Sequence, residues 1–542
     1  MAQNDYLITP QSDIFLLKCP LEIDSMHQLD FTNATTQHTY FNSLPKIEMD
    51  NATYMRKDGR LYFDASFDTC LPYNYCMYQN EGYSTKWFYA FVTDLRFESN
   101  NSCSCQLVTD VFQTWQFDVT MKYSFIERYI PSKSSDTIGA FTYPEQLEIG
   151  DYISNDAQEV SELKSQKMVI GSTADYTDLS LASNGIYQNI PTGCGYYFSN
   201  LTALGIAGMR GFLQDLTDST RQDAVTSLFL APEFLCSTTD TSSNEVKKIS
   251  NSYAPATLTY TLSTAVTGLN GYTPKNNKLY TYPYYFIQVT NGAGGNAILK
   301  PEMWDDYSTK KYRMYCALTP GCSIIGVPMD YAGYAIAWEE ALPLGKYPQL
   351  NYSTDQFTNW QTQNGLNNTI QQIAGGVQAV SGAGTLATSL TSIMAGGVGD
   401  GAGRDLTMGA HQYIGGMLQT LDAMQEKYLA SLVPAQFAGN TNSGDVWSSA
   451  SEITFRFNWM SIKYEYAHAI DLFFSMYGYR VNRLGAVLTK TRSNWNYIKT
   501  IDVNITGDIP QNDMQKLKSL YNAGFTIWHT TTHFLDYSQN NT

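Results

Sequence analysis

The stretch Lys86-Trp-Phe-Tyr-Ala-Phe-Val-Thr-Asp-Leu-Arg-Phe97 indicates the fold class of this chain. Aromatic and polar side chains alternate here, and they alternate again upstream in Leu61-Tyr-Phe-Asp-Ala-Ser-Phe67. A period of two places successive side chains on opposite faces of a β-strand. The region from Tyr40 to about Ile130 is therefore expected to form antiparallel strands.

The composition supports a chain built mainly of strands. Aromatic residues make up 14% of the 542 residues, and Tyr alone occurs 40 times. Aromatic side chains fit the pleated, half-buried surface of a sheet. A chain of this length is also too long for one ordinary core, so roughly two to four structural units are expected. The predicted fold class is mainly β, of the α+β type.

The charge balance argues against a protein that grips nucleic acid. Charged residues are only 15% of the chain and the formal net charge is -16. Affinity for nucleic acid comes mainly from Lys and Arg that neutralise phosphates, and no broad basic footprint is expected here. DNA as cargo remains compatible, because a neutral or acidic channel keeps phosphates mobile.

The cysteines and the N-terminus indicate a reducing compartment. Nine cysteines, an odd number scattered along the chain, do not resemble a disulfide framework, so most of them are expected to be reduced and buried. Cys103 and Cys105 are expected on one face of a strand, without a second ligand pair for zinc. Met1 to Cys19 lacks the features of a signal peptide, and the chain is expected to stay in the cytoplasm that makes it.

Neither the histidines nor the carboxylates form a recognisable catalytic or metal-binding motif. His529 and His533 are four residues apart, but the Thr530-Thr-Thr run between them favours extended chain and no third ligand is evident. Asp64 and Asp68 could be a glycosidase pair, yet such carboxylates are more often solvated surface residues. No catalytic, metal or cofactor residue is assigned, no cofactor is expected, and the protein is predicted not to be an enzyme.

A long uncharged segment differs from the rest of the chain. No charged residue lies between Asp355 and Asp400, and Gly, Ala, Ser and Thr are abundant there. Larger apolar residues follow one another at steps of three, four and seven, which aligns them along one helical stripe. A second stripe begins at Ile414, after a glycine-rich tip around Gly401. The two stripes are predicted to form a hairpin-like excursion that ends near Pro434.

This segment has two readings. It could be a buried structural helix, because apolar helical stripes are common in globular proteins. It could instead enter a membrane, although a spanning helix needs about 20 predominantly apolar residues and every window here contains Ser, Thr, Gln or Gly. A permanent membrane anchor is therefore not expected.

Helices are predicted at three other places. They lie at Leu201 to Leu216, at Tyr466 to Tyr477 before Gly478, and at Gln511 to Gly524, where glycine suits a helix end. Strands are expected between them, at Thr257-Leu-Thr-Tyr-Thr-Leu262, Tyr284-Tyr-Phe-Ile-Gln-Val289, Glu452 to Tyr464, Trp495 to Thr500 and Ile505 to Ile509.

Two collinear blocks of sequence resemble a known family. The first contains Lys86-Trp-Phe-Tyr-Ala-Phe-Val-Thr-Asp-Leu95, Asp110-Val-Phe-Gln-Thr-Trp-Gln-Phe-Asp118 and Ser124-Phe-Ile-Glu-Arg128. The second contains Phe473-Phe-Ser-Met-Tyr-Gly-Tyr-Arg-Val-Asn-Arg483, Asn496-Tyr-Ile-Lys-Thr500, Ile505-Thr-Gly-Asp-Ile509 and Gly524-Phe-Thr-Ile-Trp-His-Thr530. Together they resemble the tail-knob, or distal tail-tube, proteins of small short-tailed phages of the Bacillus type.

The resemblance implies a structural component of the virion tail, made in the infected bacterial cytoplasm. It implies a hexameric homo-oligomeric tube that conducts phage DNA without specific binding and that contacts other tail and collar proteins. It also implies apolar loops that plug the tube and later enter the host membrane. The residues expected in this membrane-active loop are Ile370, Ile373, Val377, Val380, Leu386, Leu390, Ile393, Met394, Val398, Ile414 and Leu418.

Four regions are predicted on this basis. Residues 1–135 and 436–542 are expected to build the β-barrel or sandwich of the tube, residues 136–360 additional small β-domains, and residues 361–435 the apolar loop, helical or irregular. An alternative from another functional class is a tail protein that binds a receptor or degrades the cell wall.

Overall fold

The computed structural model describes residues 12–52, 60–80, 85–182, 185–188, 190–219, 221, 224–250, 257–262, 268–349, 352–353, 437–438 and 453–542. The chain divides into two compact units. Unit 1 comprises Met1–Gly150, Tyr272–Leu279 and Tyr464–Thr542, and unit 2 comprises Asp151–Gly271 and Tyr280–Lys463. With 39% strand and 21% helix, the structure confirms the prediction of a mainly-β fold.

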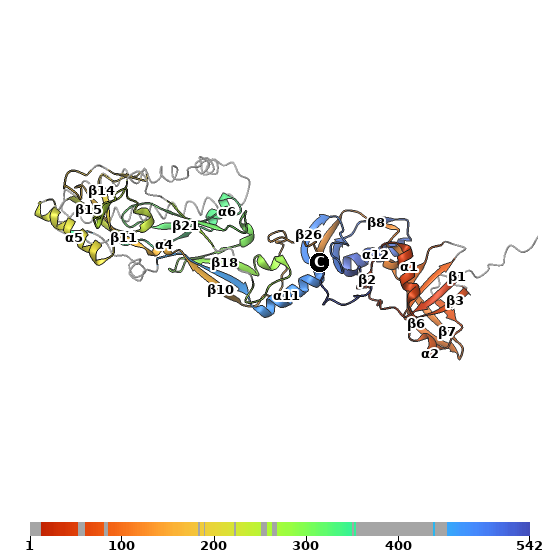
Figure 1. Ribbon diagram of the computed structural model, residues 1–542. Coiled ribbons are helices and arrows are strands. Elements are labelled where there is room, and N and C mark those ends of the chain that lie inside the picture. Colours follow the sequence, from red (N-terminus) through yellow and green to blue (C-terminus); the bar gives the residue numbers. More distant parts are fainter. Residues whose placement is uncertain are drawn as a thin grey trace, which may run out of the picture. The chain divides into compact units, whose positions relative to one another are not determined.

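The N-terminal part of unit 1 forms a six-stranded antiparallel sheet in the order β3-β1-β5-β6-β7-β4. Figure 1 labels β1, β3, β6 and β7 of this sheet. Its strands are β1 (Ser12–Leu17), β3 (Lys46–Ala52), β4 (Arg60–Phe63), β5 (Tyr75–Asn80), β6 (Phe88–Ser99) and β7 (Ser102–Thr109). The alternating stretch that predicted a strand from Lys86 is β6. The strand predicted through Phe67 ends earlier, at Phe63, because Ser66 accepts a hydrogen bond from the Thr69 N–H and starts the short helix α2 (Phe67–Cys70).

The second sheet of unit 1 joins the two ends of the chain. Its order is β2-β29-β27-β9-β26, and β2 pairs with β29 in parallel. Trp495 and Trp528 are buried on neighbouring strands with ring centroids 5.3 Å apart. The strands are β2 (His27–Leu29), β9 (Ser124–Tyr129), β26 (Tyr479–Gly485), β27 (Trp495–Asp502) and β29 (Phe525–Trp528), with β8 (Val119–Met121) and β28 (Ile505–Gly507) as a separate pair.

The other helices of unit 1 begin and end at residues with clear physical roles. Asn33 caps α1 (Ala34–Ser43), and its side chain accepts a hydrogen bond from the Thr36 N–H. The two predicted C-terminal helices are present as α11 (Tyr464–Tyr477) and α12 (Gln511–Ala523). Gly478 follows α11 at a φ of +66°, and a Cβ there would lie 2.1 Å from the Tyr129 carbonyl oxygen, so only glycine fits.

Unit 2 contains three four-stranded sheets in the orders β10-β25-β18-β19, β15-β11-β14-β16 and β17-β20-β21-β22. The first has β10 (Tyr152–Glu159), β18 (Tyr285–Thr290), β19 (Asn296–Leu299) and β25 (Arg456–Ile462). The second has β11 (Gln166–Ser172), β14 (Gly195–Asn200), β15 (Val225–Pro232) and β16 (Val246–Lys248). The third has β17 (Thr257–Thr261), β20 (Lys311–Cys316), β21 (Ile324–Met329) and β22 (Leu342–Pro343).

Short elements complete unit 2. They are the pair β12 (Ile186–Tyr187) and β13 (Ile190–Pro191), α4 (Ser161–Lys164), α6 (Tyr334–Glu339), η2 (Glu233–Leu235) and η4 (Pro301–Met303), while η3 (Asn277–Tyr280) spans the boundary. The predicted helix at Leu201 to Leu216 is present as α5 (Ala203–Asp218). Its buried face is formed by Met209, Phe212 and Leu216, at helical spacing, against the sheet that contains β14.

The boundaries of the two units differ from the predicted regions at three places. Residues 136–150, which lie in the predicted region 136–360, belong to unit 1. β25, which lies in the predicted region 436–542, belongs to unit 2 because it pairs on both sides with β10 and β18. Tyr272–Leu279 belongs to unit 1 because the Asp471 carboxylate of α11 holds it. That carboxylate accepts hydrogen bonds from the Tyr272 hydroxyl at 2.7 Å and from the Lys275 N–H at 2.8 Å.

A buried ionic cluster lies between this segment and the second sheet of unit 1. The Glu145 side chain is fully buried and pairs with Lys278, whose side chain is 3% exposed, and with Arg128. Glu145 also accepts a hydrogen bond from the Arg480 backbone N–H at 2.8 Å. Burial lowers the pKa of Lys278, and the Glu145 carboxylate opposes that shift. Each buried charge in this cluster is therefore stabilised by the oppositely charged side chains that contact it.

A second buried carboxylate caps α3 (Val111–Trp115), which packs against β6. Asp110 is 1% exposed and accepts hydrogen bonds from the N–H groups of Phe112 and Gln113, both at 3.1 Å, and from the Tyr75 hydroxyl at 3.0 Å. Burial raises the pKa of Asp110 from 3.8 to about 6, and these hydrogen bonds oppose the shift.

This shift leads to an expected pH dependence. Because the pKa of Asp110 is higher in the folded state, its contribution to stability is full below pH 3.8 and is lost as the pH rises through about 6. At neutral pH the free energy of unfolding is therefore lower by roughly 3 kcal/mol than it would be with Asp110 protonated. Asp110→Asn keeps an oxygen for the helix cap but cannot titrate. The stability of this variant relative to the parent is therefore expected to rise between pH 4 and pH 7, as measured by denaturant unfolding.

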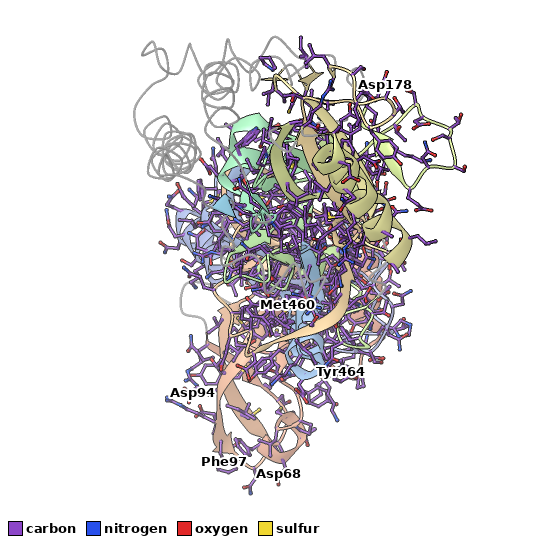
Figure 2. The ribbon with its side chains drawn as sticks, turned by 90° about the vertical axis from the view of Figure 1, so that its left-hand side faces the viewer. Asp68, Asp94, Phe97, Asp178, Met460 and Tyr464 are labelled. Atoms are coloured by element: carbon purple, nitrogen blue, oxygen red, sulfur yellow. The ribbon has the colours of Figure 1, made fainter. Side chains whose placement is uncertain are left out.

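An exposed carboxylate supplies the control for that experiment. Hydrogen bonds from Ser180 lower the pKa of Asp178 (labelled in Figure 2), so Asp178 stabilises the folded state above its unfolded pKa. Relative to the parent, Asp178→Asn should lose stability, not gain it, as the pH rises. If both variants follow the same trend, the burial of Asp110 is not the cause of the pH dependence.

Candidate functional site

The candidate site is the base of the long uncharged segment. The eleven residues predicted for the membrane-active loop, from Ile370 to Leu418, lie outside the described residues. On either side of the segment the structure describes β23 (Tyr352–Ser353) and β24 (Phe437–Ala438), which pair in antiparallel fashion. Paired residues in such a ladder have Cα atoms about 4.5 to 5.5 Å apart. The two ends of the segment 354–436 therefore lie next to each other.

The chain that leads into this base is anchored by buried contacts in unit 2. Tyr347 is 1% exposed, and its hydroxyl donates to the Leu163 carbonyl oxygen at 3.1 Å. The Pro348 carbonyl oxygen accepts from the Leu230 N–H at 2.9 Å, and Gln349 forms a β-bridge with Phe229 of β15. The Tyr347 ring is buried, its hydroxyl is hydrogen-bonded, and the backbone of Pro348 and Gln349 pairs with β15. The chain that leads into the segment is therefore fixed in unit 2 as far as Gln349.

The chain that leaves the segment is anchored just as firmly. The Thr454 hydroxyl donates to the Val160 carbonyl oxygen at 2.8 Å, and the Val160 N–H donates to the Phe455 carbonyl oxygen at 3.2 Å. Ile453 and Phe455 are buried, and β25, which begins at Arg456, is a central strand of its sheet. Sequence reasoning missed these anchors, because single buried Tyr and Thr residues carry no periodic signal.

This geometry suits a long insertion on a rigid scaffold. Insertions are tolerated best where their two ends lie close together on a supported base, because the fold then does not depend on the inserted chain. Of the helices that the structure describes, none has both the length and the apolar character needed to cross a membrane.

The histidines and cysteines considered for metal binding lie in separate surroundings. His529 is held by Asp30, whose oxygen is 3.1 Å from Nδ1, and by Asn496, whose oxygen is 3.0 Å from Nε2. His529 and His533 follow β29 in a turn and not in a helix. The described part of the chain contains no group of three or more His, Cys, Asp or Glu side chains that could hold a metal ion.

All nine cysteines are buried and have free thiols, as predicted. Cys103 and Cys105 lie on β7, where burial raises the pKa of Cys105 to about 12. Burial likewise raises the pKa of Cys194 to about 11. The thiols of Cys105 and Cys194 are therefore protonated at neutral pH, and a protonated, buried thiol is a poor nucleophile.

The carboxylate pair considered for glycosidase chemistry lies on the protein surface. Asp64 follows β4 and Asp68 lies in the first turn of α2, and both are exposed. Figure 2 shows Asp68 at the same end of the six-stranded sheet as Phe97 of β6. Neither carboxylate therefore lies in the buried setting that is typical of a general acid.

Two family models match the chain. Residues 244–542 match the model described as Bacillus phage phi29, Tail knob protein gp9, C-terminal domain. Residues 10–120 match the model described as Caudoviral major tail protein N-terminus. The first match covers more than half of the sequence and includes the base of the uncharged segment.

Similar whole proteins agree with these matches. The chain is 24% identical to the tail knob protein gp9 of Bacillus phage phi29, with 95% of this chain and 96% of the relative covered. It is 25% identical to the tail knob protein gp9 of Bacillus phage PZA, with the same coverage. The solved structure of the bacteriophage C1 tail knob protein gp12 has a TM-score of 0.67 at 13% identity over 98% of this chain and 99% of that one, which shows a shared fold.

Proposed function

This chain belongs to the family of the Bacillus phage phi29 tail knob protein gp9, C-terminal domain, and from that premise we propose that it forms the distal tube of a phage tail. It is a structural component of the virion tail, and its relatives carry a structural name, tail knob protein. The observation that supports the proposal best is the agreement along the whole chain in both sequence and fold.

The proposed assembly is a closed ring of six copies around a bore. Unit 1 supports this role because strands from both ends of the chain share one sheet, which gives each copy a rigid wall segment. Copies that join head to tail through heterologous contacts end in a ring when the rotation closes. With a net charge of -16, the wall can present a neutral to acidic bore, through which DNA passes without binding.

The proposed role of the uncharged segment is to plug this bore and then to enter the host membrane. The absence of charge between Asp355 and Asp400 removes the main penalty against hydrocarbon, roughly 2.5 to 3.5 kcal/mol per charged residue at a helix centre. In a single copy, placing Ser, Thr and Gln side chains in hydrocarbon without hydrogen-bond partners still costs free energy. Six copies whose small residues pack closely can satisfy these groups across helix contacts or around water. The adjacent strands β23 and β24 let the segment leave unit 2 without disturbing it.

The ring is tested by measuring mass in solution together with electron microscopy. The purified protein at micromolar concentration is expected to give a species of six times the 60.7 kDa chain mass and images of a ring with a central hole. A protein that stays monomeric under the salt and divalent-cation conditions that keep virions intact contradicts the proposal. A receptor-binding role without a tube predicts particles that have no central hole.

A further inference from the structure

One edge of the five-stranded sheet of unit 1 exposes apolar and basic side chains. The edge strand is β26, and on its outer side no strand of the described chain pairs with it. Leu484 is 68% exposed and lies directly opposite Phe125 of β9, which is 38% exposed. The neighbouring Arg483 is exposed, and its guanidinium donates to the Tyr129 hydroxyl at 2.8 Å. Within the described part of the chain, Arg483 has no carboxylate partner.

The other edge of the same sheet exposes apolar and acidic side chains. This edge is β2, and the tight turn that precedes it contains Ile23, 58% exposed, and Met26, 40% exposed. Glu22 and Asp24 lie in the same turn and are exposed. Burial lowers the pKa of His27, the first residue of β2, and the Asp24 and Glu22 carboxylates oppose that shift. Among the described residues, neither carboxylate pairs with Lys or Arg.

We propose that these two edges meet between neighbouring copies, so that the turn Glu22–Met26 of one copy docks on β26 of the next. This inference rests on the proposed ring. Four strand spacings of about 4.8 Å separate the two edges within one chain, roughly 19 Å, so they cannot meet in the same copy. Two different patches on opposite edges form a heterologous contact, which is the kind that generates a ring.

The chemistry of the two patches selects a second copy of this chain as the occupant. The basic Arg483 matches Glu22 and Asp24 in charge, and such complementarity fixes the register of an interface. Ile23 and Met26 match Leu484 and Phe125 as apolar side chains that a partner would cover. Beyond Arg480, whose N–H is already bonded to Glu145, β26 is an open strand edge, and such an edge invites pairing with another chain unless it is covered. The same contact, repeated around the ring, covers both patches in every copy.

The apolar part of the contact is tested with two matched leucines. Leu484→Asp places a charge in the proposed contact, whereas Leu204→Asp places the same charge on α5, where Leu204 is also 68% exposed. The first variant is expected to need at least tenfold more protein to form rings, measured by mass photometry, and the second should assemble like the parent. Circular dichroism checks that both variants are folded. Normal assembly of a folded Leu484→Asp variant overturns the inference.

The identity of the occupant is tested by exchanging charges. Arg483→Glu alone and the pair Glu22→Lys with Asp24→Lys alone should each impair assembly, because each variant sets like charges against each other. An equimolar mixture of the two variants should recover rings, since every contact between unlike neighbours then joins opposite charges. All three changes in one chain should recover them as well. Impaired variants that neither mixing nor combination rescues show that another partner occupies this edge.

The outcomes separate this inference from the proposed function. If the parent protein forms rings and the variants assemble normally, the ring stands and its contact lies elsewhere. If the parent protein forms no ring under any virion-like condition, the proposed tube fails and the contact between copies fails with it. Arg210→Glu, which changes the charge in unit 2 by the same amount as Arg483→Glu, should assemble normally and control for net charge.

Discussion

Replacing residues 356–434 by a short Gly-Ser linker is expected to abolish the release of dye from lipid vesicles while leaving the fold and the ring intact. The fold should survive because β23 and β24 already hold the two ends of the segment side by side, and the flanking chain is anchored at Tyr347 and Thr454. A linker of about four residues spans a gap of this size, since each extended residue covers about 3.3 Å. Circular dichroism, mass photometry and vesicle leakage measure the three properties in one preparation.

Point substitutions test the same role without removing chain. Val380→Asp with Leu390→Asp places two charges in the uncharged segment, and insertion should become less favourable by roughly 5 to 7 kcal/mol for each copy. The release of dye from vesicles is therefore expected to fall strongly, while the mass of the assembled ring stays unchanged. Leu204→Asp on α5 serves as the control, because it adds charge at an exposed leucine outside the segment.

Two results of the deletion experiment would contradict the proposed role of the segment. A deletion variant that does not fold shows that the segment contributes to the core, as a buried structural helix would. A variant that folds and leaks dye like the parent shows that membrane activity lies in another part of the chain. Neither result affects the membership of the family, which rests on the whole sequence and on the shared fold.

Removal of the Glu145 side chain is expected to have the largest effect on the stability of unit 1. In Glu145→Ala the Lys278 ammonium stays buried without its carboxylate, and the Arg480 N–H loses its acceptor. Breaking a buried ion pair by removing one partner costs about 3 to 5 kcal/mol. The loss should appear as faster hydrogen exchange in β9, β26 and β27, measured by mass spectrometry under native conditions.

Two variants control for this effect. Glu159→Ala removes a carboxylate that pairs with Lys164 and Arg456 while 26% exposed, and partly solvated pairs contribute about 0 to 1 kcal/mol. Glu145→Leu with Lys278→Met removes both buried charges, and it should recover much of the lost stability because no unpaired charge remains at Lys278. Arg128 keeps its hydrogen bond to the Gly478 carbonyl oxygen in that variant. If Glu145→Ala costs no more than Glu159→Ala, the cluster is not a main support of unit 1.

The sequence by itself determined much of the local structure. Alternating side chains identified β6, helical spacing and glycine identified α5, α11 and α12, and the net charge of -16 argued against a broad basic nucleic-acid interface. These features depend on neighbours within one turn or one strand, so their signal lies in consecutive residues. The uncharged segment was recognised for the same reason, because the absence of charge is a property of consecutive residues.

Only the tertiary structure decided which distant segments meet. A period of two shows which face of a strand is buried but not which strand lies beside it. The pairing of β9 with β26 and β27, the parallel pair of β2 and β29, and the ladder of β23 with β24 therefore have no signature in consecutive residues. The Asp471 carboxylate, which holds the Tyr272–Leu279 segment, likewise resembles any helix-surface acid in the sequence. Such partners are selected by the burial and hydrogen bonding of the whole unit, which satisfy each polar group only once every strand is in place.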